Sequence, residues 1–151
     1  MKTECISKRR SVFFRLSVFL MFLSFSTLCA YGDIIIDNGG SGTSYTGTWT
    51  VSGGSQPYGT DSLWSRNGDT YTWQFSSQPA GTYEVLLWWT AYSSRSSNAA
   101  VDINYWDGTT RVYVNQQQSG ENWNSVGTFY FGGSGSVMVT ASNGSDVSTC
   151  A

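Results

Sequence analysis

The segment from Thr82 to Ala91 alternates between apolar and mixed positions along its length. Successive side chains of a strand point to opposite faces of the sheet. The odd-numbered positions are therefore predicted to face the core, and they are Tyr83, Val85, Leu87 and Trp89. The even-numbered positions mix polar and apolar types, so Trp88 on that face is either exposed or covered by a second element.

Short runs of β-branched and aromatic residues recur after residue 32, separated by Gly, Ser and Asn. No stretch places apolar residues at helical spacing, so each run is predicted to form a strand. Besides Thr82–Ala91, the predicted strands are Asp33–Asp37, Thr46–Val51, Thr70–Ser76, Asn98–Trp106, Thr109–Val114, Ser125–Phe131 and Ser136–Ala141. This number of strands with short connections predicts an all-β fold, an antiparallel β-sandwich of jelly-roll type.

The dipeptide Asp107-Gly108 separates two alternating runs and predicts a hairpin. An Asp-Gly pair favours a two-residue type I′ turn, because both turn positions need positive φ. In that register Asn104 lies opposite Arg111, and Asp102 lies opposite Tyr113. The predicted inner face consists of Val101, Ile103, Tyr105, Thr110, Val112 and Val114. The predicted outer face consists of Asp102, Asn104, Trp106, Thr109, Arg111 and Tyr113.

This outer face combines two aromatic rings with amide, carboxylate and guanidinium groups. Sugar rings stack their C–H faces on aromatic rings, and their hydroxyls hydrogen-bond to such polar groups. We therefore predict a carbohydrate site made of Trp106, Tyr113, Arg111, Asn104 and Asp102, which Trp88 joins if its own face is exposed. The same residues also fit a solvated sheet face that holds only cross-strand pairs.

Three further groups of residues have a functional and a structural interpretation. Tyr92, Arg95 and Asn98 occupy a serine-rich loop, which either carries binding groups or is a polar connection. The amides of residues 115–118 are predicted to hydrogen-bond to the backbone rather than to a ligand. Core packing is predicted for Trp49, Trp73, Trp89 and Trp123.

Residues 1–30 are predicted to be a secretory signal peptide that is cleaved after Ala30. Basic residues between Lys2 and Arg15 precede an apolar run, Leu16–Leu28, that is short for a membrane span of about 20 residues. A retained anchor and a lipoprotein attachment through Cys29 are the alternatives. The domain of residues 31–151 is thus expected to be secreted, either to the periplasm or outside the cell, with no membrane insertion after cleavage.

The charged residues of the segment 31–151 narrow the classes of function. The segment has three arginines, no lysine or histidine, and nine acidic residues, so its net charge is −6. Nucleic acids and anionic membranes, which need basic surfaces, are poor matches. Proton transfer and nucleophilic catalysis need groups with tuned pKa values, and the segment is poor in titratable groups, so no enzyme is predicted. Two facing carboxylates of a glycosidase are an alternative that the sequence leaves open.

The cysteine and acidic residues predict neither a disulfide nor a cofactor. Cys150 is the single cysteine of the segment 31–151, so no disulfide forms within it. The acids lack the spacing of an EF-hand loop, and zinc lacks its histidine and cysteine ligands. No metal site is predicted, and a structural calcium ion is the alternative that the sequence leaves open.

From Ile34 onward the chain resembles the golvesin/xanthan-lyase carbohydrate-binding-like domain of bacterial secreted proteins. The matching pieces are Ile36-Asp37, Gly47-Thr48-Trp49, Tyr71-Thr72-Trp73, the run from Gly81 to Trp89, the run from Asp107 to Gln116, and the run from Trp123 to Phe131. The resemblance implies a non-catalytic module that binds polysaccharide or a cell-surface glycan. It brings no ligand-site motif, so the site proposed above rests on geometry.

Family members continue past the equivalent of Ala151 with another short strand. The resemblance therefore also implies a C-terminally truncated domain that lacks its last strand and has an exposed β edge. A structural or adhesive surface domain that contacts proteins is the alternative function. The sequence indicates neither the particular glycan nor the oligomeric state.

Overall fold

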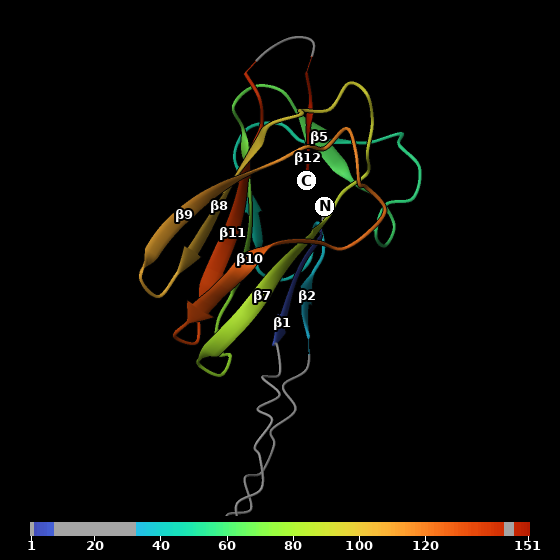
Figure 1. Cartoon of the computed structure of the whole chain (residues 1–151). Helices are drawn as coiled ribbons and strands as arrows, with labels where there is room; N and C mark the ends of the chain where they lie inside the picture. Colours follow the sequence, from blue (N-terminus) through green and yellow to red (C-terminus); the bar gives the residue numbers. More distant parts are fainter. Residues whose placement is uncertain (1, 8–32, 144–146) are drawn as a thin grey trace, which may run out of the picture.

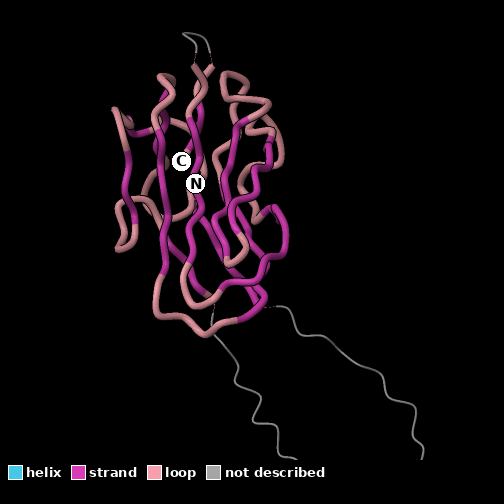
Figure 2. Tube along the Cα trace, turned by 90° about the vertical axis from the view of Figure 1, so that its left-hand side faces the viewer, coloured by secondary structure: helices cyan, strands magenta, loops and turns pink. Residues whose placement is uncertain are grey.

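The structure, a computed structural model, describes the backbone of residues 2–7 and the full residues 33–143 and 147–151. Strands and loops make up all of these residues, as Figure 2 shows. The prediction of an all-β fold with antiparallel sheets is confirmed. The jelly-roll subdivision stays a prediction.

Two larger sheets and one small sheet make up the described part of the chain (Figure 1). The four-stranded sheet has the order β10 (Asn124–Phe131), β7 (Gly81–Trp88), β1 (Lys2–Ser7) and β2 (Ile34–Ile36). The five-stranded sheet has the order β3 (Thr43–Tyr45), β6 (Thr70–Phe75), β11 (Gly135–Thr140), β8 (Ala99–Tyr105) and β9 (Gly108–Val114). The small sheet has the order β12 (Thr149–Cys150), β5 (Leu63–Ser65) and β4 (Thr50–Val51).

The core lies between the two larger sheets and follows the predicted alternation. All four odd-numbered residues of the segment around β7 are buried, and they pack in one cluster with Val101 and Ile103 of β8. Burying a side chain of this size contributes about 1.5–3 kcal/mol. Trp73 and Trp89 are buried in this core as predicted, whereas Trp49 and Trp123 are half-buried.

The hairpin of β8 and β9 has a register that differs from the predicted one. Asp102 pairs with Arg111, and Tyr105 pairs with Gly108, so the two turn residues are Trp106 and Asp107. Of these residues only Gly108 has a positive φ, 122°, so a type I′ turn over Asp107-Gly108 is ruled out. The predicted pairing was wrong by two residues. Because two is the period of side-chain alternation, the strand residues of both predicted faces lie on the predicted sides, whereas Trp106 lies in the turn.

A second difference from the prediction concerns the segment that was predicted as the strand Thr46–Val51. It is a strand only at β4, because a tight turn precedes it. Gly47 has a φ of 69° and lies against the carboxylate of Asp69, which accepts a hydrogen bond from the Thr48 amide at 2.9 Å. The short strands β3, β5 and β12 were not predicted, because two or three residues show no alternation.

Strand β1 lies within the segment predicted to be a signal peptide. It pairs with β7 from Lys2↔Trp88 to Ser7↔Tyr83, and on its other side with β2. The rest of that segment, with the predicted cleavage point after Ala30, lies outside the described residues. The signal peptide, the domain boundary and the absent last strand stay predictions.

Candidate functional site

Four of the predicted site residues, Asp102, Asn104, Arg111 and Tyr113, share the outer face of β8 and β9, as the alternation requires, and Trp106 lies in the turn that joins these strands. β9 is the edge strand of the five-stranded sheet, and β8 is its neighbour. Trp106 is 73% exposed and Tyr113 is 58% exposed, and the Asn104 side chain is exposed as well. We call the surface formed by Asp102, Asn104, Trp106, Arg111 and Tyr113 the hairpin face.

An ion pair joins the two charged residues of the hairpin face. Arg111 donates from Nε to Asp102 Oδ1 and from Nη2 to Asp102 Oδ2, both at 2.7 Å. These two hydrogen bonds raise the pKa of Arg111, with the negative charge of Asp102 as the second cause. The cross-strand register places the two residues directly opposite each other, so the pair follows from the hairpin pairing.

Trp106 occupies a defined position at the tip of the hairpin. Its backbone amide donates to Tyr130 O at 3.1 Å, and its ring lies against Gly132, where a Cβ atom would overlap the ring. A shallow pocket beside the ring is lined by Asn104, Tyr105, Trp106, Gly132, Ser134 and Gly135. The ring is therefore held on one side and open to solvent on the other, which suits stacking on a ligand.

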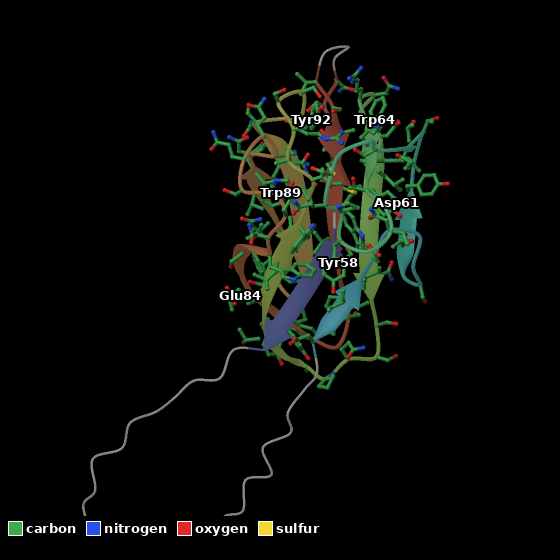
Figure 3. The ribbon with its side chains drawn as sticks, turned by 90° about the vertical axis from the view of Figure 1, so that its right-hand side faces the viewer. Tyr58, Asp61, Trp64, Glu84, Trp89 and Tyr92 are labelled. Carbon is green, nitrogen blue, oxygen red and sulfur yellow. The ribbon has the colours of Figure 1, made fainter. Side chains whose placement is uncertain are left out.

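Trp88 does not share the hairpin face. It lies on β7 of the other large sheet, in an aromatic cluster with Tyr58 at 5.5 Å and Trp123 at 5.7 Å between ring centroids. Its indole nitrogen donates to Gln56 O at 3.4 Å. The segment around Tyr58 thus covers the even-numbered face of β7, and Trp88 is half-buried there. Figure 3 shows Tyr58 over the strands of this sheet.

The side-chain amides of Asn115, Gln116 and Gln117 hydrogen-bond to backbone, as predicted, and the Gln118 side chain is exposed. Gln116 is fully buried and forms two hydrogen bonds with the backbone of Cys150. Gln117 donates to Arg95 O at 2.9 Å and to Ser93 O at 3.2 Å. These hydrogen bonds hold the backbone of the serine-rich loop against residues 116–117, so the loop is anchored to the rest of the domain.

The serine-rich loop lines a pocket that sequence reasoning missed. Tyr92 and Arg95 were singled out, but their neighbours Trp64 and Arg66 come from β5 and the residue after it. Asn98 does not line this pocket. No pattern within one segment points to the pocket, because its walls are far apart in the sequence.

Within the described residues, no three histidine, cysteine, aspartate or glutamate side chains gather in a way that could hold a metal ion. The same residues contain no helix with the length and apolar character needed to cross a membrane.

The two packed antiparallel sheets and the exposed aromatic-polar face define a small all-β module. The sequence profile of the golvesin C-terminal domain family matches residues 34–150, so the chain belongs to this family. The chain is 39% identical over 114 residues to a xanthan lyase from Bacillus sp. strain GL1. That match covers 70% of this chain and 12% of the enzyme.

A solved structure gives a second match to part of a xanthan lyase. Xanthan lyase from Paenibacillus has a domain that superimposes on 74% of this chain with a TM-score of 0.67 and 30% sequence identity. The match covers 11% of that enzyme, so the chain corresponds to a small part of each xanthan lyase.

Proposed function

We propose that the chain is a non-catalytic, secreted module that binds polysaccharide through the hairpin face. The observation that carries this proposal is the pair of exposed rings, Trp106 in the turn and Tyr113 on β9, on the same hairpin as the Asp102–Arg111 ion pair. Rings that lose little conformational freedom offer stacking surface, while the polar groups orient hydroxyls. The relation to a small part of two xanthan lyases supports an accessory role beside an enzyme that acts on a polysaccharide.

The geometry predicts binding of modest strength. The hairpin face is an open sheet surface at an edge strand rather than a deep cleft, so it can cover only one side of a sugar chain. Small contact areas give small binding energies after the cost of ordering is subtracted. We expect dissociation constants of about 1 mM to 1 μM, or roughly −4 to −8 kcal/mol.

The test is a titration of the tryptophan fluorescence of the chain with soluble polysaccharides, xanthan among them. A saturable change is expected for the native chain, and its loss is expected in Trp106→Ala and Tyr113→Ala. Tyr45→Ala is the matched control, because Tyr45 is 62% exposed but lies on β3 at the opposite edge of the same sheet. Equal losses in Tyr113→Ala and Tyr45→Ala would contradict a site on the hairpin face.

A structural or adhesive surface domain is the second candidate. The observation that favours it is the edge position of β9, whose outer backbone groups have no neighbouring strand within the described residues. Such an edge accepts a strand from a protein partner. A folded chain that responds to no glycan would favour this second function.

A further inference from the structure

The arginines of the described residues fall into two groups. Arg111 is paired with Asp102 on the hairpin face. Arg66 and Arg95 instead line one pocket of about 260 Å³. The other lining residues are Ser52, Gly53, Gly54, Trp64, Tyr92, Ser94 and Ser148. Figure 3 places Trp64 and Tyr92 at the same end of the molecule, above Trp89 and Asp61.

Arg95 is held rigidly at this pocket. It is 5% exposed, and its guanidinium donates from Nη1 to Ser148 Oγ at 3.0 Å and from Nη2 to Ser52 Oγ at 2.6 Å. Its buried Nε has no hydrogen-bond partner. A guanidinium carries five N–H donors, so the two serines use only part of its capacity. The backbone of the loop is fixed too, since the Arg95 amide donates to Tyr92 O.

Arg66 is the second cation of the pocket. Its guanidinium lies over the ring of Trp64, 4.9 Å from the ring centroid. Trp64 and Arg66 are two residues apart at the end of β5, which places both side chains on one side of the strand. The Nε of Arg66 is also buried without a hydrogen-bond partner. Stacking thus holds the guanidinium without neutralising it.

No carboxylate of residues 33–143 or 147–151 lies within ion-pair distance of Arg66 or Arg95. Burial lowers the pKa of Arg95, the neighbouring Cys150 raises it, and the charge of Arg66 lowers it further. Two cations that share a pocket repel each other, and a buried charge without a counter-ion is costly. The segment 31–151 is otherwise strongly acidic, so two cations that gather in one place with no carboxylate of the described residues beside them call for an anion.

A hydroxyl adds a neutral donor to this pair. Ser52 Oγ accepts hydrogen bonds from Arg95 Nη2 and from the Gly54 amide at 3.0 Å, which leaves its own proton for another acceptor. Gly53 next to it has no atom within 4 Å of a Cβ position, so the wall is open there. Tyr92 is 58% exposed at the pocket and offers a ring face.

We propose that this pocket binds the carboxylate of an acidic sugar residue, with Arg66 and Arg95 as the charged donors, Ser52 as the hydroxyl donor and Tyr92 beside the sugar ring. The negative charge of the ligand follows from the arginines alone. Its identity as a sugar rests on the proposed function. The pocket is a second site, distinct from the hairpin face.

The experiment compares an oligosaccharide of glucuronate with its carboxyl-reduced counterpart, by calorimetric titration of the full chain at constant ionic strength. The acidic form is expected to bind at least about tenfold more tightly. Its carboxylate accepts charge-assisted hydrogen bonds from the arginines, and the reduced form has no carboxylate to accept them. Arg66→Gln should abolish this preference. Arg111→Gln removes the same charge at the hairpin face, where its loss should weaken binding of both oligosaccharides alike, so the ratio of their affinities should persist in it. Arg95→Lys is the second pocket variant, which keeps the buried charge but loses the fork of donors.

The outcomes separate the two proposals. Equal binding of both oligosaccharides would overturn the acidic pocket and leave the hairpin face standing. Binding of the acidic form alone, dependent on Arg66 but unchanged by Trp106→Ala, would support the pocket and overturn the hairpin face. Binding of neither form by the folded chain would overturn both.

Two controls address other anions. Inorganic sulfate or phosphate that displaces the acidic oligosaccharide at equal or lower concentration would overturn the assignment to a sugar carboxylate. Asp146, near Ser148 in the sequence, lies outside the described residues. An acid preference found only in Asp146→Asn would mean that the chain's own carboxylate fills the pocket, and would overturn the proposal.

Discussion

Gln116 shows how one buried side chain can replace a strand partner. Its Nε2 donates to Cys150 O at 2.9 Å, and its Oε1 accepts from the Cys150 amide at 2.7 Å. These bonds satisfy both backbone groups of a fully buried residue at the end of β12. The sequence indicated that the amides of residues 115–118 bind backbone. It did not indicate which one is buried, because four adjacent amide side chains look alike without the contact to Cys150.

Gln116→Ala would leave both Cys150 backbone groups buried without partners. Each orphaned group costs about 1–3 kcal/mol, so the free energy of unfolding should fall by about 2–6 kcal/mol. Urea denaturation measures this change. Gln118→Ala is the control, since its side chain is exposed, and a shift of less than about 0.5 kcal/mol is expected. Equal shifts in the two variants would contradict this role.

At the scale of elements, the hairpin of β8 and β9 depends on two separate features. Side-chain alternation decides which residues face outward, and turn geometry decides which residues pair across the strands. Alternation assigned Asp102 and Arg111 correctly to the outer face. The turn type set their pairing, and the positive φ falls on Gly108 at the end of the turn rather than on two central residues. The Asp102–Arg111 ion pair is a consequence of that shift, which a sequence pattern could not anticipate.

Gly108→Ala should destabilise the hairpin through its backbone alone. A Cβ at Gly108 would meet nothing within 4 Å, but a φ of 122° is strained for any L side chain. A loss of about 1–3 kcal/mol is expected in thermal or urea unfolding. Gly53→Ala, which is equally open but has no positive φ, should change the unfolding free energy by less than about 1 kcal/mol. A neutral Gly108→Ala would refute this account of the turn.

At the scale of the whole molecule, β1 completes the four-stranded sheet between β7 and β2. Its residues Lys2 to Ser7 pair with β7, a strand in which four of the eight residues are buried. If residues 1–30 are cleaved as a signal peptide, β7 and β2 lose this partner. Their facing backbone groups would then be open to water or to another strand.

A chain that begins at Tyr31 should accordingly unfold at a lower urea concentration than the full chain. It should also associate in a concentration-dependent way, because unpaired strands accept partners. Light scattering coupled to size-exclusion chromatography and urea unfolding measure the two effects. A shortened chain that is monomeric and as stable as the full chain would show that β1 contributes nothing to the sheet.

Local patterns sufficed for the all-β class, the core residues of β7 and both faces of the hairpin, since each depends on side chains that alternate along one strand. The acidic charge and the missing histidine likewise follow from composition. The features that the sequence did not predict depend on contacts between residues that are far apart in the chain. Arg95 bonds to Ser52 across 43 residues and to Ser148 across 53. The covered position of Trp88 depends on Tyr58. Contacts between distant segments have no local signature, so only the packed molecule could bring two arginines into one pocket in which no carboxylate of the described residues pairs with them.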